Sequence, residues 1–221
     1  MGFDFVGATP GKGKVPTKNI DNITDGLIGF VEKNIALGNT IVVLWSDHGF
    51  HLGEKRSHTK FSLWEESTRV PFIIWDPRGQ AGNGKTCAEP VGLINVYRTL
   101  CDMTGLEPPE YVDGMSLVPW LIDPAKPMGK PAMTTWGRGN YTLRTKNWCY
   151  TRYFDGTEEL YDHTKDPQEW INLASNPEHA NMKRQLARKW LPKTEAPRVL
   201  SGKELDNAWD AAKPKKRPKT E

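Results

Sequence analysis

Three polar side chains that could bind a metal ion and an anion follow a short apolar run. Residues 41–45 are apolar, and after Ser46 the chain places Asp47 next to His48. A carboxylate beside an imidazole forms a compact pair of ligands for a divalent cation. Lys60 stands thirteen residues after Asp47 and supplies a positive charge for an anionic substrate. We therefore predict a metal site at Asp47 and His48, with Lys60 beside it.

A plainer interpretation of the same residues involves no chemistry. Asp47 can cap a helix or a turn, and His48 can simply pack against its neighbours. A lysine in a charged loop is usually solvated, which is the corresponding interpretation of Lys60. The tripeptide Asp47-His48-Gly49 does not decide between these alternatives, so its surroundings have to.

The element that must position these side chains is a strand over residues 41–45. Five apolar residues are too few for a typical helix, and a continuous run predicts a strand buried on both faces of a parallel sheet. In open α/β sheets, chemistry lies beyond the carboxyl ends of such strands. Upstream, apolar residues at helical intervals predict a helix over residues 20–35 that ends at Gly38. Helix, turn and strand together make half of a βαβ unit.

The rest of the chain divides into an α/β part and a smaller antiparallel part. We predict a second buried strand over 70–75, a helix over 93–101 that ends at Gly105, and a packing segment over 114–121. Short β-rich segments at 141–145, 148–153 and 159–161 predict an antiparallel meander. A terminal amphipathic helix follows over 181–190. The predicted divisions are an irregular lead-in (1–18), an α/β part (19–129), an antiparallel subdomain (130–192) and a disordered basic tail (193–221).

Composition excludes several classes of function. The 30 basic and 27 acidic side chains give a net charge of only +3, which does not favour nucleic acid as a partner. No stretch approaches the ~20 apolar residues of a membrane span, and the first residues do not form a signal peptide. The three cysteines, Cys87, Cys101 and Cys149, predict neither a zinc site nor a disulfide framework, although one disulfide is compatible with the sequence. The cellular location stays open.

Several linked motifs resemble those of the type I sulfatases, in the same order and spacing. They are Ser46-Asp-His-Gly49, Leu52-Gly-Glu-Lys55, His58-Thr-Lys60 and Trp64-Glu-Glu-Ser-Thr-Arg-Val-Pro71, followed near the end by Glu159-Leu-Tyr-Asp162, Asp166-Pro167 and Glu169-Trp-Ile-Asn-Leu-Ala174. The resemblance covers about residues 20–192, and the iduronate-2-sulfatase-like branch is the most similar.

The resemblance implies a fold, a reaction and a cofactor. The fold is an alkaline-phosphatase-like α/β/α sandwich, present only from its later strands and followed by the small antiparallel subdomain with its helix. The reaction is hydrolysis of sulfate esters by a formylglycine nucleophile bound to Ca²⁺. By resemblance, Asp47 and His48 are metal ligands and Lys60 binds the sulfate, with His58 a weaker candidate in the same cleft. We expect Glu65, Glu66 and Arg69 to form an ion-pair network that holds the loop, and His51 to be a surface or packing residue.

One departure from the family pattern limits this interpretation. Formylglycine forms from Cys or Ser in a C/S-x-P-x-R motif, and no cysteine or serine of this chain stands in such a context. We therefore expect the chain to correspond to the C-terminal half of a sulfatase. Two alternatives remain: a phosphodiesterase or phosphonate hydrolase of the same superfamily, or a catalytically inert fragment that completes a separate N-terminal chain. The expected substrate is a sulfated small molecule or glycan, and full-length relatives are usually exported, periplasmic or lysosomal.

Overall fold

The computed structural model describes residues 3–6, 33, 38, 40–79, 82–193 and 203. The helix predicted over 20–35 and the basic tail predicted from 193 therefore lie outside the described residues, apart from isolated positions. The chain divides into two compact units, of which the first ends at Leu191 and the second comprises residues 192–221. All of the elements that position the site belong to the first unit.

A four-stranded mixed sheet, which we call sheet A, carries the end of the apolar run. Its strands are β1 (Phe3–Val6), β2 (Val42–Trp45), β3 (Val70–Trp75) and β4 (Thr86–Cys87), in the order β2-β3-β1-β4. β3 pairs antiparallel with β2 and parallel with β1, and β1 pairs antiparallel with β4. The predicted strand over 70–75 is confirmed.

Two sequence predictions about this sheet are wrong. Among the described strands, β2 is an edge strand that pairs with antiparallel β3 alone, and it is not buried on both faces: the exposed fractions of Leu44 and Trp45 are 52% and 50%. The lead-in is not wholly irregular either, because Phe3–Val6 forms β1, parallel to β3. An apolar run shows what a strand can bury, whereas the strands that pair with it decide what it does bury.

Helices cover sheet A and complete its core. α3 (Asn95–Thr104) ends at Gly105, whose left-handed φ of 73° caps the helix as the sequence predicted. α4 (Val118–Ile122) lies in the predicted packing segment, and Leu117, Trp120 and Leu121 are buried there. These residues pack with Phe72 and Ile74 of β3 in one core cluster. Its other buried members are Val70, Cys87, Val91 and Met103.

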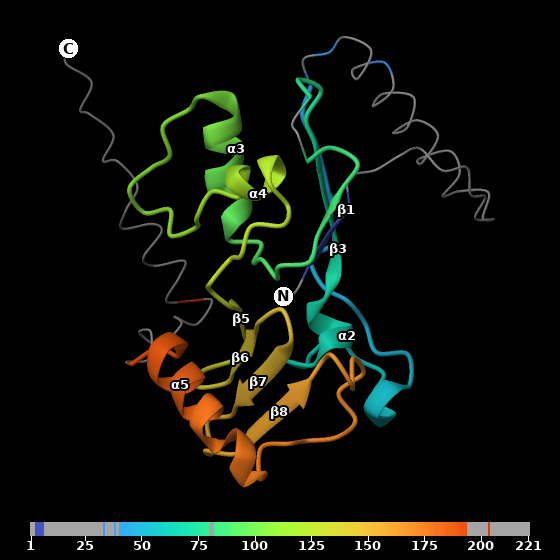
Figure 1. The fold of residues 1–221 in the computed structure, drawn as a ribbon, viewed down its shortest axis with the longest axis vertical. Helices are drawn as coiled ribbons and strands as arrows, with labels where there is room; N and C mark the ends of the chain where they lie inside the picture. The colour runs from blue at the N-terminus through green and yellow to red at the C-terminus, as the bar shows by residue number, and fades with distance from the viewer. Residues whose placement is uncertain are drawn as a thin grey trace. The chain divides into compact units, whose positions relative to one another are not determined.

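The second sheet, sheet B, is the predicted antiparallel meander. Its strands β5 (Ala132–Thr135), β6 (Tyr141–Arg144), β7 (Trp148–Arg152) and β8 (Glu158–Asp162) pair in sequence order. A 3₁₀ turn, η2 (Pro177–His179), leads into α5 (Ala180–Trp190), the predicted terminal helix, which lies beside the meander in Figure 1. Met182, Leu186 and Trp190 of α5 pack on the core of sheet B, which contains Leu143, Tyr150 and Leu160.

Two further sequence predictions can be compared with the described residues. All three cysteines are described, and each is buried with a free thiol, so the disulfide that the sequence allowed does not form. No helix within the described part of the chain is long and apolar enough to cross a bilayer.

Candidate active site

Hydrogen bonds hold the turn that follows β2, on which the candidate site residues Asp47 and His48 lie. The Ser46 backbone N–H donates to the Pro71 carbonyl at 3.3 Å, and the Ser46 hydroxyl donates to the His48 carbonyl at 2.9 Å. The Gly49 N–H donates to the Ser67 carbonyl of α2 (Glu65–Thr68) at 3.0 Å. A Cβ atom on Gly49 would lie 2.0 Å from the Glu66 carbonyl oxygen. Only glycine fits at this position, because the chain passes directly against the backbone of α2.

Asp47 and His48 lie on this turn with their polar atoms close together. The Asp47 side chain is 82% exposed, and its Oδ2 lies 3.5 Å from His48 Nε2. His48 Nδ1 lies 2.8 Å from the Gly49 carbonyl, so Nδ1 carries the proton and donates it. Nε2 then presents a lone pair. A histidine that donates its other ring N–H to a backbone carbonyl is the usual arrangement of a metal ligand.

The structure brings Lys60 to the same place. Its Nζ lies 2.9 Å from His48 Nε2, and the neutral ring nitrogen accepts a hydrogen bond from the ammonium group. Asp47, His48 and Lys60 are therefore one cluster, as the sequence indicated. His58 is exposed and lies beside Gly53 on the same loop, and within the described part of the chain no hydrogen bond or ion pair connects it to the other three residues.

The loop between His48 and α2 contains residues whose position the sequence did not reveal. Lys55, to which the sequence gave no role, belongs to the 3₁₀ turn η1 (Glu54–Arg56) and reaches sheet B, where its Nζ donates to the Tyr161 hydroxyl at 3.0 Å. Trp64 Nε1 donates to Glu159 Oε2 at 2.8 Å. Lys55, Trp64, Glu159 and Tyr161 all belong to the motifs that resemble the family. The motifs therefore marked these residues, but they did not show which of them are in contact.

The predicted local ion pairs are found in part. Glu65 Oε1 lies 4.0 Å from Arg69 Nη1, as expected, yet its nearer cationic partner is Arg144 of β6, whose Nε lies 3.1 Å from Glu65 Oε2. Glu66 is exposed. His51 is fully buried and packs edge-on against Trp64, with ring centroids 5.7 Å apart, which confirms the predicted packing role.

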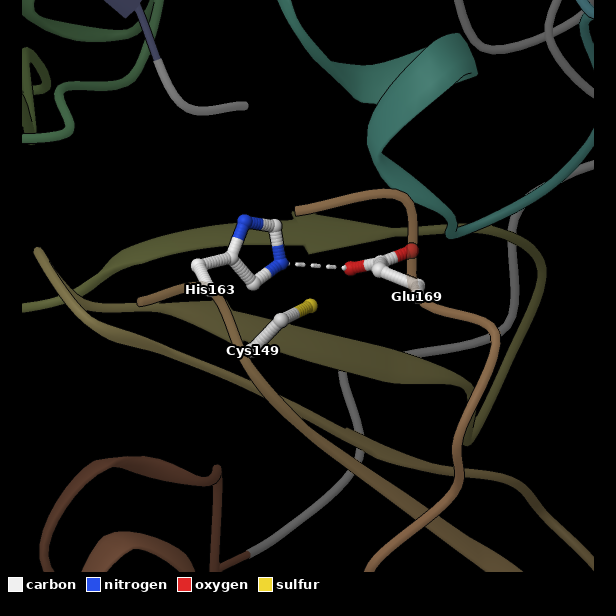
Figure 2. Close-up of side chains that lie close together, drawn as sticks. All are labelled: Cys149, His163 and Glu169. Carbon is white, nitrogen blue, oxygen red and sulfur yellow. Dashed lines mark hydrogen bonds and ion pairs between the residues drawn. The ribbon is translucent and has the colours of Figure 1, made fainter. Parts of the chain in front are cut away.

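A second cluster of chemically capable side chains lies inside the molecule. Cys149, His163 and Glu169 point toward one another (Figure 2), and their candidate ligand atoms lie within 4.8 Å of each other. His163 Nε2 donates to Glu169 Oε1 at 3.0 Å, and the Glu65 backbone N–H donates to Glu169 Oε2 at 2.9 Å. Both carboxylate oxygens are thus already used. Burial raises the pKa of the Cys149 thiol well above its ordinary value, so it stays protonated. This cluster is satisfied as a hydrogen-bonded network without a metal.

A cavity elsewhere in the molecule contains residues of neither cluster. It has a volume of about 610 Å³ and lies between the start of α3 and β5, with Asn95, Asp113 and Lys130 among its polar lining residues. Asn95 already accepts a hydrogen bond from the Met115 N–H at 3.0 Å. The cavity contains none of Asp47, His48, His58 or Lys60, so cavity size does not locate the candidate site here.

The chain is similar in sequence to known sulfatases. The sulfatase family model matches residues 17–106, which contain the whole turn and the loop. A sulfatase of Formosa agariphila is 39% identical over 158 residues, which cover 72% of this chain and 31% of that protein. The chain therefore spans about a third of the length of the curated relatives it matches.

Solved structures give the same fold. A structure in complex with its substrate D-glucosamine-2-N,6-O-disulfate is 28% identical, with a TM-score of 0.64 over 76% of this chain and 37% of that chain. The phosphonate monoester hydrolase of Agrobacterium radiobacter is 27% identical, with a TM-score of 0.63 over 74% of this chain and 37% of that chain. The fold is thus a partial alkaline-phosphatase-like α/β fold. In sequence and in fold, the chain is thus similar to part of a sulfatase.

Proposed function

We propose that the chain supplies one side of a sulfatase active site, which hydrolyses sulfate esters. The observation that carries this proposal is the convergence of Asp47, His48 and Lys60 on one exposed turn. Hydrolysis of a sulfate ester needs a bound cation, a counter-charge for the sulfate oxygens and a nucleophile. The first two needs match groups in this cluster.

The donor set at the turn fits a divalent cation. Asp47 offers an exposed carboxylate, and the tautomer of His48 leaves a lone pair on Nε2, 3.5 Å from Asp47 Oδ2. Both can contact one cation, and Ca²⁺ is the candidate that the family resemblance suggests. When bound, the ion would neutralise negative charge on the nucleophile and the sulfate. A calcium ion normally takes 6–8 oxygen ligands, so two side chains are an incomplete shell.

Lys60 would provide the counter-charge for the sulfate. Its ammonium group now uses the lone pair of His48 Nε2, at 2.9 Å. A cation on Nε2 would displace Lys60 from this lone pair and leave its charge free for a sulfate oxygen. His58 belongs to the same loop and is exposed, so it is the weaker candidate for a second contact with the sulfate.

The remaining ligands and the nucleophile would come from outside this chain. None of the three cysteines is accessible to a substrate, because all three are buried. We propose that the chain acts as the C-terminal half of a sulfatase of the iduronate-2-sulfatase-like branch, with an N-terminal half as its partner. The exposed edge of β2, with Leu44 and Trp45, is where that half would add its strands. A sulfated glycan is the substrate class we infer, since the structural neighbour described above was solved with a disulfated glucosamine.

A second candidate function is hydrolysis of phosphonate monoesters. The likeness to the Agrobacterium radiobacter enzyme, with a TM-score of 0.63, favours it. Its substrate carries the same kind of tetrahedral anionic centre, which Lys60 and a cation could bind equally well. The two functions differ in the substrate turned over and not in the need for Lys60.

A chimera tests the proposed reaction. The part of the Formosa agariphila sulfatase that precedes its matched region would be joined to this chain, and turnover of an aryl sulfate and of a phosphonate monoester would be measured. Lys60→Ala should lower kcat/KM for the sulfate by about 100-fold or more, since one charge that stabilises the transition state is lost. Lys189→Ala on α5 is the matched control. A chimera that favours the phosphonate establishes the second candidate, and unchanged turnover in Lys60→Ala contradicts both.

Cation binding can be measured on the chain itself. Tb³⁺ is a luminescent substitute for Ca²⁺, and Trp45 lies two residues before Asp47, close enough to sensitise it. We expect sensitised emission that Ca²⁺ competes away and that Asp47→Asn abolishes. Asp102→Asn, on the exposed side of α3, is the control and should leave the emission unchanged. Equal emission from the Asp47 variant would remove the assignment of the cation site.

A further inference from the structure

The loop that carries His58 and Lys60 has a backbone conformation that its own hydrogen bonds do not stabilise sufficiently. Its base is closed by two backbone hydrogen bonds, from the His51 N–H to the Thr59 carbonyl and from the Gly53 N–H to the Ser57 carbonyl, both 3.0 Å. At its tip, Lys55 and Arg56 have positive φ angles of 52° and 57°. Left-handed backbone is unfavourable for residues other than glycine, so contacts elsewhere must stabilise it.

Lys55 makes those contacts with two aromatic rings. Its Nζ lies 4.6 Å from the centroid of the Trp64 ring and 4.3 Å from that of Tyr161, and it also donates to the Tyr161 hydroxyl at 3.0 Å. The face of an aromatic ring attracts a cation, and this attraction is stronger where the cation is partly desolvated. Burial lowers the pKa of Lys55, although the nearby carboxylates Glu169 and Glu159 oppose this change.

The far end of the loop is held by the buried network, whose residues His163 and Glu169 follow β8. Glu169 accepts the first N–H of α2, from Glu65, and is oriented by His163 next to Cys149 (Figure 2). Glu169 also has a positive φ, at 61°. The loop that presents Lys60 is therefore fixed at its tip and at its end by residues that come about 100 positions later in the chain.

We propose that Lys55 is a positioning residue: held between Trp64 and Tyr161, it fixes the loop that presents Lys60, so that sheet B sets the geometry of the sulfate site. This inference rests on the proposed function for what the loop binds, but the order of the loop can be measured without any substrate. It connects the Leu52-to-Lys55 motif with the Glu159-to-Asp162 motif, which lie far apart in the sequence.

We call the contacts of Lys55 with Trp64 and Tyr161 the clamp. Residue-resolved amide exchange on the whole chain tests it. Lys55→Met keeps the length of the side chain and removes its charge. We expect the amides of His51 and Gly53 to exchange at least about 10-fold faster, since Lys55→Met removes both cation–π contacts and the hydrogen bond to Tyr161, while the amides of β6 and β7 stay protected. Tyr161→Phe, which removes only the hydroxyl, should give a smaller increase. Lys55→Arg should restore protection, because a guanidinium stacks on the same rings.

The control is Lys189→Met, which removes a cation 4.6 Å from the Trp190 ring centroid on α5 and should leave the loop unaffected. Folded Lys55→Met protein with unchanged exchange at His51 and Gly53 would overturn the clamp, and so would equal acceleration in β6 and β7. In the chimera, Lys55→Met should lower kcat/KM for the sulfate about 10-fold, with recovery in Lys55→Arg. If Lys60→Ala has no effect there, the proposed function fails while amide exchange still decides the clamp.

Discussion

The two sheets of this chain differ in how completely their strands are paired and their apolar side chains buried. Every strand of sheet B pairs with its neighbour in sequence, and α5 closes the core, in which Leu143, Tyr150 and Leu160 are fully buried. Sheet A ends in β2, whose Leu44 and Trp45 are half exposed at the point where Asp47 and His48 begin. The self-contained sheet carries none of the proposed site residues but holds their loop. Sheet A carries the proposed ligands beyond β2, the strand to which we propose that another half adds its strands.

The largest difference between the sheets should appear on removing one leucine from each. Leu160→Ala in β8 leaves a cavity in a fully buried position and should lower the free energy of unfolding by about 2–5 kcal/mol. Leu44→Ala in β2 removes a side chain that is 52% exposed and should cost less than about 1 kcal/mol. Denaturant unfolding of both variants checks this. Similar losses would mean that the edge of β2 is covered in solution.

Substitutions at two glycines distinguish the cost of a steric clash with the backbone from the cost of an unfavourable backbone conformation. Gly49→Ala places a Cβ 2.0 Å from the Glu66 carbonyl oxygen and should cost about 3 kcal/mol, because the backbone of α2 must move. Gly156→Ala, in the β7–β8 hairpin, meets no atom within 4 Å and should cost only about 1 kcal/mol, from its φ of 84°. Unfolding free energies measure both. Equal costs would show that the turn after β2 can relax away from α2.

The smallest expected effect concerns the carboxylate of Glu169, which accepts the backbone N–H of Glu65 in α2. Burial alone would raise the pKa of Glu169, but hydrogen bonds from His163, Cys149 and the Glu65 N–H outweigh it and lower the pKa below its ordinary value of 4.5. The ionised carboxylate therefore stabilises the fold above about pH 4.5, and this contribution is lost as the pH falls through the lower folded-state pKa.

Glu169→Gln should accordingly cost about 2 kcal/mol at pH 7, with the difference from wild type shrinking as the pH falls below 4.5. Unfolding curves at several pH values give the comparison. Asp102→Asn, which removes an exposed i,i+4 partner of Arg98, is the control and should change stability by less than about 0.5 kcal/mol. A loss in Glu169→Gln that does not depend on pH would show that the carboxylate contributes through shape and not through charge.

Local patterns in the sequence determined much of this protein. The short β-rich segments and turns of residues 141–161 predicted the meander, and residues 181–190 predicted an amphipathic helix, which is α5 with Met182, Leu186 and Trp190 packed on sheet B. Gly105 marked the end of α3 because left-handed backbone suits glycine. The spacing of Asp47, His48 and Lys60 indicated a common site, because a strand end and a short loop keep such residues near each other.

Only the tertiary structure decided the contacts that join distant segments. Strand partners depend on the whole sheet, so the apolar run of β2 could not show that its neighbour would be antiparallel and its other edge open. The meeting of Lys55 with Tyr161, and of Glu65 with Glu169, joins residues more than 100 positions apart. Periodicity and spacing report only on neighbours within a few turns of chain. The residues that hold the Lys60 loop were therefore visible as motifs, but their function as a clamp required the fold.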